Sequence, residues 1–243
     1  MKLEQAIPHN KYFRIQKQAK ASQSIFVDEK VDDNFAMNVI SQYEKLCQQT
    51  GGQQAKKLVI LSEASDIEDI AQEYEQLAEY LENDAKIAYG VYAKKDDTIC
   101  IVQNNHKRKE KKYEGDLNSQ GSDTLTHEFA HLLDKEYSKS HIFRNAYLQD
   151  LKDFEKNLKK NANKKIADSD MTYEEAKEYF KHYIEGTDFT DGIDEKDISR
   201  TGARENFAES YSVIFDSNPS KINAIYSNLF GNSIKAVKSF LFV

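Results

Sequence analysis

The sequence contains few of the residues that interrupt helices, with only two Pro and nine Gly among 243 residues. This composition favours a helix-rich fold with few breaks. No stretch approaches the ~20 consecutive apolar residues of a transmembrane helix, so we expect no membrane span. The first thirty residues contain no hydrophobic signal core, so they do not predict a cleavable secretion signal.

Cysteine is scarce and the charge balance is acidic. Cys47 and Cys100 lie far apart, in segments predicted as helix and strand, and they form neither a disulfide framework nor a metal-ligand spacing. We expect both to be core residues. The net charge of −7, with 31% charged residues, disfavours general nucleic-acid binding. The basic run at 106–112 is predicted to be a solvated loop rather than a phosphate-binding patch.

The run His127-Glu128-Phe129-Ala130-His131 carries the clearest chemical signal. Residues one helical turn apart share a face, so His127 and His131 can reach one metal ion from a single helix. Glu128 lies about 100° round the helix, where a carboxylate can take a proton from a metal-activated water. The pattern is that of zinc peptidases.

The residues around this pattern favour a metal-binding helix. Ser122 and Asp123 offer cap oxygens for a helix start there. An apolar stripe at helical spacing predicts a separate core-facing side, and the histidines project from nearly the opposite side. The stripe consists of Leu125, Phe129, Leu132 and Leu133.

A catalytic zinc site needs a third protein ligand and one open position. Asp134 and Tyr137 stand where a metzincin would have Gly and His, so that class is excluded, and Asp134 stays a minor ligand candidate. Glu205 and Glu209 share one helix face, opposite Phe207, Tyr211 and Ile214. One carboxylate would complete the metal shell, and the other would accept the N–H of a ligating imidazole. A solvated acidic face is the alternative interpretation of this pair.

The segment Ser199–Ser210, which reads S-R-T-G-A-R-E-N-F-A-E-S, resembles the third-ligand segment of the anthrax lethal factor-like metallopeptidases, which include the bacterial Pro-Pro endopeptidases. The stretch H-E-F-A-H-L-L-D also resembles the titration-factor peptidases. The resemblance covers roughly residues 57–243. It implies zinc held by His127, His131 and Glu205, with Glu128 as the general base. It also implies that Glu209 is a carboxylate that contacts a metal ligand and does not bind the zinc itself.

One departure from this family concerns transition-state stabilisation. The family carries a Tyr seven residues before the ligand Glu, as an oxyanion donor, and that position is Ile198 here. Losing one such donor typically costs ~10²–10³ in turnover. His182 and Tyr183 are the candidate replacement donors. The two motifs also stand farther apart than in the family, which indicates an inserted helical segment.

These observations predict an α+β, gluzincin-like fold: a small mixed β-sheet, an active-site helix and a mainly helical C-terminal half. We expect an N-terminal helical extension over 1–56 and a metallopeptidase domain over 57–243, with a helical insertion at about 137–198. Expected elements are a helix from Phe35 to Leu46, a strand at 58–61, a helix at about 65–83 and a hairpin of 87–93 with 98–103.

The predicted function is a zinc metalloendopeptidase, a hydrolase that cleaves peptide or protein substrates through a zinc-activated water, with one Zn²⁺ per chain. The resemblance favours a secreted or delivered bacterial effector or toxin-like protease over a cytoplasmic peptidase. The alternative is a catalytically weak or inactive module of the same fold with a binding or regulatory role. A helical interaction protein without metal is a third hypothesis. A separation of ~10 Å or more between the Glu205 carboxyl oxygens and both imidazoles would exclude the shared ion.

Overall fold

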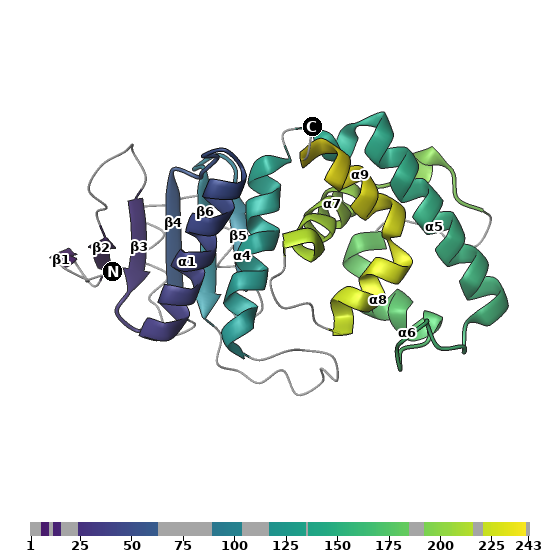
Figure 1. The fold of residues 1–243 in the computed structure, drawn as a ribbon, viewed down its shortest axis with the longest axis horizontal. Helices are drawn as coiled ribbons and strands as arrows, with labels where there is room; N and C mark the ends of the chain where they lie inside the picture. The colour runs from purple at the N-terminus through teal and green to yellow at the C-terminus, as the bar shows by residue number, and fades with distance from the viewer. Residues whose placement is uncertain are drawn as a thin grey trace. The chain divides into compact units, whose positions relative to one another are not determined.

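The computed structural model describes residues 6–9, 12–15, 24–62, 89–103, 117–134, 136–184, 192–215 and 221–241. The chain forms two compact units, residues 1–111 with 115–133 and residues 112–114 with 134–243. Within the described ranges the protein is mixed α/β, with one sheet and mostly helical structure (Figure 1). No helix in these ranges is long and apolar enough to cross a membrane. The expected helix at 65–83 and the basic run at 106–112 lie outside the described residues.

The first unit is built on a mixed sheet with strand order β1-β2-β3-β4-β6-β5. Its strands are β1 (Ala6–His9), β2 (Tyr12–Ile15), β3 (Ser24–Asp28), β4 (Lys57–Ser62), β5 (Gly90–Ala93) and β6 (Thr98–Gln103). β4 runs parallel to both β3 and β6, and its residues are almost all buried. A parallel strand covered on both faces reads as a continuous apolar run, which is why 58–61 is recognisable in the sequence.

The predicted hairpin is present and forms one edge of this sheet. β5 pairs antiparallel with β6, with Gly90 opposite Ile101 and Ala93 opposite Thr98. Asp97, in the connecting turn, has a φ of 49°, a conformation that Asp tolerates better than most residues do. Because β5 is the last strand in the order, one side of its backbone has no partner strand among the described residues.

Helix α1 (Asp33–Gln49) connects β3 to the parallel strand β4. Asp32 caps its start by accepting hydrogen bonds from the backbone N–H groups of Asn34 and Phe35. The helix ends just before Gly51 and Gly52, whose φ angles of 67° and 91° suit glycine at a helix C-terminus. The helix expected from Phe35 to Leu46 is therefore confirmed.

Helix α4 (Leu117–Leu133) packs against α1 within the first unit. The rings of Tyr43 and Phe129 meet edge to face, with centroids 5.7 Å apart. Inside this contact, Gln42 Nε2 donates to Thr126 Oγ1 at 3.0 Å. A Cβ on Gly121 would lie 2.6 Å from Phe35 Cε2, so glycine lets the two helices approach closely.

Two sequence-based expectations need correction here. The predicted boundary at 56/57 separates two strands that pair with each other, β3 and β4, so residues 24–56 supply a strand and a helix to the sheet unit and are not a helical extension. The helix carrying His127 begins at Leu117, not at the Ser122 and Asp123 caps. Glycine is a poor helix former, but the close contact of Gly121 with α1 explains why it lies inside the helix.

The regular elements in the described ranges of the second unit are all helices, apart from an isolated β-bridge between Lys165 and Thr172. Its elements are η1 (Tyr137–Lys139), α5 (His141–Asn161), α6 (Tyr173–Tyr179), η2 (Lys181–Ile184), η3 (Glu195–Asp197), α7 (Arg200–Phe215), α8 (Lys221–Leu229) and α9 (Gly231–Leu241). An apolar stripe on α5 is buried, as are the aromatic rings it meets. The stripe consists of Phe143, Tyr147, Leu151 and Phe154. Thr172 and Glu175 form a capping box at the start of α6.

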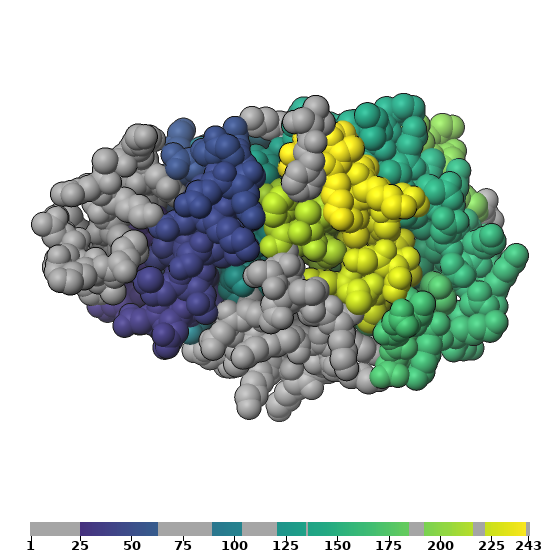
Figure 2. Space-filling model, viewed as in Figure 1, coloured from purple at the N-terminus to yellow at the C-terminus, as the bar shows by residue number. Residues whose placement is uncertain are grey.

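A buried carboxylate connects α5 to the start of α9. Asp150, which is 3% exposed, accepts hydrogen bonds from the backbone and side chain of both Asn232 and Ser233. Two of these four donors are backbone N–H groups at the start of α9, which the carboxylate satisfies. Within this unit, α8 and α9 pack together and form part of its surface, coloured yellow in Figure 2.

Candidate metal centre

Helix α4 presents His127 and His131 away from its core-facing stripe. Leu125 and Phe129 on that stripe are fully buried, whereas both histidines are half-buried. The centroids of the two imidazole rings lie 4.9 Å apart, and the ring planes meet at an angle of 84°. The spacing of one helical turn therefore gives two neighbouring nitrogen ligands, as the sequence predicts.

Glu128 is on α4, and its side chain lies against the edge strand β5 of the sheet. Its side chain is 9% exposed, and a Cβ on Gly90 of β5 would stand 3.1 Å from its Cγ. Burial, followed by the nearby Glu128 charge, raises the pKa of the Cys100 thiol in β6 well above its usual range. Cys100 is thus an inert core residue, and neither it nor Cys47 forms a disulfide.

Helix α7 carries the two acidic residues singled out in the sequence. Its first turn is capped by Ser199, whose Oγ accepts from the Gly202 N–H at 2.8 Å. Phe207 and Tyr211 are fully buried, and Glu205 and Glu209 are half-buried. The predicted division of this helix into an apolar face and an acidic face is confirmed.

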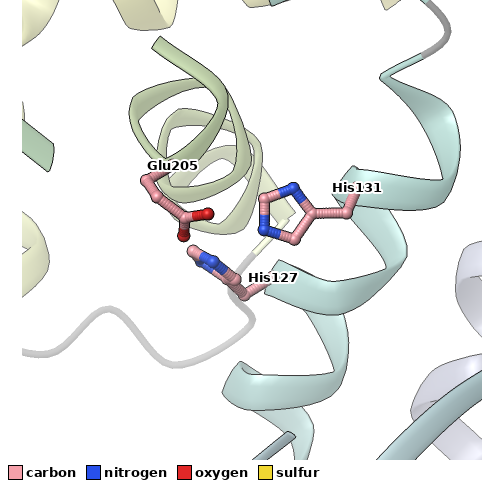
Figure 3. A group of neighbouring side chains, drawn as sticks. All are labelled: His127, His131 and Glu205. Atoms are coloured by element: carbon pink, nitrogen blue, oxygen red, sulfur yellow. The ribbon is translucent and has the colours of Figure 1, made fainter. Parts of the chain in front are cut away.

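His127, His131 and Glu205 form a group that could hold a metal ion. Each offers one ligand atom, and these atoms all lie within 4.8 Å of one another; Figure 3 shows the three side chains directed toward a common point. Ligands at about 2.0–2.2 Å from a tetrahedral ion stand roughly 3.4 Å apart, a separation that falls within this 4.8 Å limit. Two imidazole nitrogens and a carboxylate oxygen are a donor set that suits zinc and other divalent metals.

The Glu209 side chain forms a hydrogen bond with a residue of η2. The Tyr183 hydroxyl donates a hydrogen bond to Glu209 Oε2 at 3.2 Å. Burial raises the pKa of Tyr183 well above its usual range, and the charges of Glu209 and Glu205 raise it further. The phenol of Tyr183 therefore lies near both carboxylates. The other predicted donor, His182, is exposed on η2 and does not belong to the metal-ligand group.

Ile198, which the resemblance aligns with the family's Tyr, is buried and lies in the segment before α7. Its carbonyl accepts from Arg144 Nη2 at 3.3 Å, and the same nitrogen donates to the Glu195 carbonyl at 3.1 Å. The guanidinium also forms an ion pair with the Glu195 carboxylate. Arg144 thus fixes the backbone that leads into the ligand helix, a role that a single Arg in a helical pattern does not signal.

Asp134, the minor ligand candidate, has a local structural role. Its Oδ1 accepts from the Ser138 N–H at 2.8 Å and its Oδ2 from the Ser138 hydroxyl at 2.6 Å. Both carboxyl oxygens therefore hold the turn that follows α4. Asp134 is not a member of the metal-ligand group.

No protein-family model, curated protein or solved structure matches this chain. The resemblance to lethal factor-like peptidases consequently stays a prediction from the two motifs. The arrangement of His127, His131 and Glu205 is independent of that resemblance.

Proposed function

We propose that this protein is a zinc-dependent endopeptidase of the gluzincin type. The observation that carries this proposal is the group of His127, His131 and Glu205, with ligand atoms within 4.8 Å of one another. Two of these residues flank Glu128, a carboxylate suited to proton transfer. The mixed sheet and the helical second unit are compatible with that class. Action as a secreted or delivered effector remains a prediction from the resemblance.

In the proposed reaction, His127, His131 and Glu205 would hold the ion. A zinc ion there would act as a Lewis acid and lower the pKa of a coordinated water to ~7. Glu128 would accept the proton of the attacking water and return it to the leaving amine. Its low exposure suits this task, because a buried carboxylate is shielded from bulk water.

The edge strand β5 is an observation in favour of a peptide substrate. Its outer side has no partner strand in the part of the chain that the structure describes, and Gly90 on this strand lies against Glu128. An extended peptide can add to such an edge through backbone hydrogen bonds. Pairing there would place a substrate backbone beside the proposed general base without requiring a particular side chain.

A peptide-library screen with stoichiometric zinc tests the proposal. We expect the native protein to cleave a subset of peptides, and Glu128→Gln to lose cleavage while keeping its zinc. Failure of both proteins to cleave any peptide, with zinc bound, would refute the endopeptidase function. Equal cleavage by both would show that Glu128 is not the base.

A second candidate function is a zinc-binding module with little or no catalysis. Two observations favour it: a buried Ile198 stands where the family has its oxyanion donor, and the Tyr183 hydroxyl is engaged by Glu209. Losing a donor of this kind costs ~10²–10³ in turnover. Tight zinc binding without cleavage in the same screen would support this module.

A further inference from the structure

We infer that Tyr183 is a positioning residue for the metal centre, which orients the Glu209 carboxylate, and that it is not an oxyanion donor. This inference rests on the proposed zinc site. It deepens that proposal by assigning an outer-shell pair, Tyr183 and Glu209, to a group whose ligands are His127, His131 and Glu205.

Tyr183 is itself fixed at both ends. Its backbone carbonyl accepts a hydrogen bond from the Tyr147 hydroxyl on α5. Its ring packs on Phe180 and Tyr226, with centroid separations of 6.0 and 5.6 Å. A side chain held in this way can transmit a fixed geometry to the carboxylate that it contacts.

The single hydroxyl proton of Tyr183 decides between its two candidate roles. A phenol has one O–H to donate, and in this structure it is donated to Glu209. Donation to a reacting carbonyl would require breaking that bond and leaving a half-buried carboxylate without this donor.

The position of Glu209 on α7 suits a carboxylate that strengthens metal binding without being a ligand. It lies one turn after Glu205 on the same face of α7, so it adds a second negative charge beside the proposed ligand. Carboxylates next to ligands orient imidazole N–H groups and strengthen metal binding, and their loss typically costs 10–100-fold in affinity. Tyr183 would act on the metal only through this carboxylate.

The test is a double-mutant cycle read out as the zinc dissociation constant, measured by competition with a chelator. The four proteins are the native chain, Tyr183→Phe, Glu209→Gln and the double variant. Tyr173→Phe on α6 is the matched control, because it also removes a phenol oxygen but belongs to no contact with Glu209. Thermal unfolding of each protein verifies that it is folded.

We expect Tyr183→Phe to raise the zinc dissociation constant by about 10-fold or more and to add no further loss in the Glu209→Gln background. At saturating zinc, any fall in kcat of Tyr183→Phe should be well below the ~10²-fold that loss of an oxyanion donor costs. Unchanged zinc affinity in Tyr183→Phe would overturn the inference, and so would a loss of affinity that persists in full in the Glu209→Gln background. A ~10²–10³-fold lower kcat at saturating zinc would also overturn it, because that loss is the sign of an oxyanion donor. A native protein that binds no zinc would refute the proposed function itself, and the inference with it.

Discussion

Gly90 on the edge strand β5 lies directly against Glu128 on α4. A Cβ at position 90 would stand 3.1 Å from Glu128 Cγ and 2.6 Å from Thr124 Cγ2. The missing side chain therefore lets the sheet edge and the helix approach closely, and it leaves the Glu128 carboxylate in its present position. This contact joins the proposed substrate edge to the proposed general base.

Gly90→Ala should consequently impair catalysis more than zinc binding. The added methyl group must displace Thr124 or Glu128, and a misplacement of about 1 Å at a reacting group can cost roughly 10²-fold in rate. We expect kcat/KM to fall by about 10–100-fold while the zinc dissociation constant stays within a few-fold. Denaturant unfolding should show a loss of about 1–3 kcal/mol from overpacking.

Gly231→Ala is the matched control for this substitution. A Cβ at Gly231 meets no heavy atom within 4 Å, so the Gly231→Ala protein should lose no stability and should gain at most about 1 kcal/mol from helix propensity. If Gly90→Ala behaves like this control in both activity and stability, the close packing of β5 on Glu128 is not a feature of the protein in solution.

Asp150 provides a stability prediction for the second unit. Asp150→Ala would leave four donors of Asn232 and Ser233 without their carboxylate. Leaving buried donors unsatisfied costs about 1–3 kcal/mol, and more for charged partners. Chemical denaturation should therefore show a loss of at least ~2 kcal/mol in the free energy of unfolding.

Asp153→Ala, on the same helix, is the control for Asp150. Asp153 is exposed, and its side chain accepts one hydrogen bond from Gln149. Its removal should change the free energy of unfolding by no more than about 0.5 kcal/mol. Similar losses for the two variants would contradict the assigned anchoring role of Asp150.

Local patterns in the sequence predict the parts of the fold that depend on one segment. The apolar run of β4 and the hairpin appear in the structure at or near their expected positions. The same holds for the faces of α4 and α7, because the helical period alone decides which residues share a side. The three candidate ligands are recognisable in this way, by residue type and spacing.

Interactions between distant segments are not predictable in the same way. The parallel pairing of β3 with β4 joins two strands that α1 separates in the sequence, and no local pattern encodes it. Gly121 reads as a helix breaker, but a close helix contact overrides its low propensity. The hydrogen bond from Tyr183 to Glu209 joins two helical segments, so the sequence nominates Tyr183 without revealing its partner.

The most direct test of the account is the zinc content and zinc affinity of the purified protein. We expect one zinc per native chain. Loss of an outer-shell partner typically lowers metal affinity by roughly 10–100-fold, and Glu205→Gln should lower the zinc affinity by more than this. Glu178→Gln, a change at an exposed position on α6, should bind zinc as the native chain does. Native affinity in Glu205→Gln, or no zinc in the native chain, would contradict the claim that His127, His131 and Glu205 share one ion.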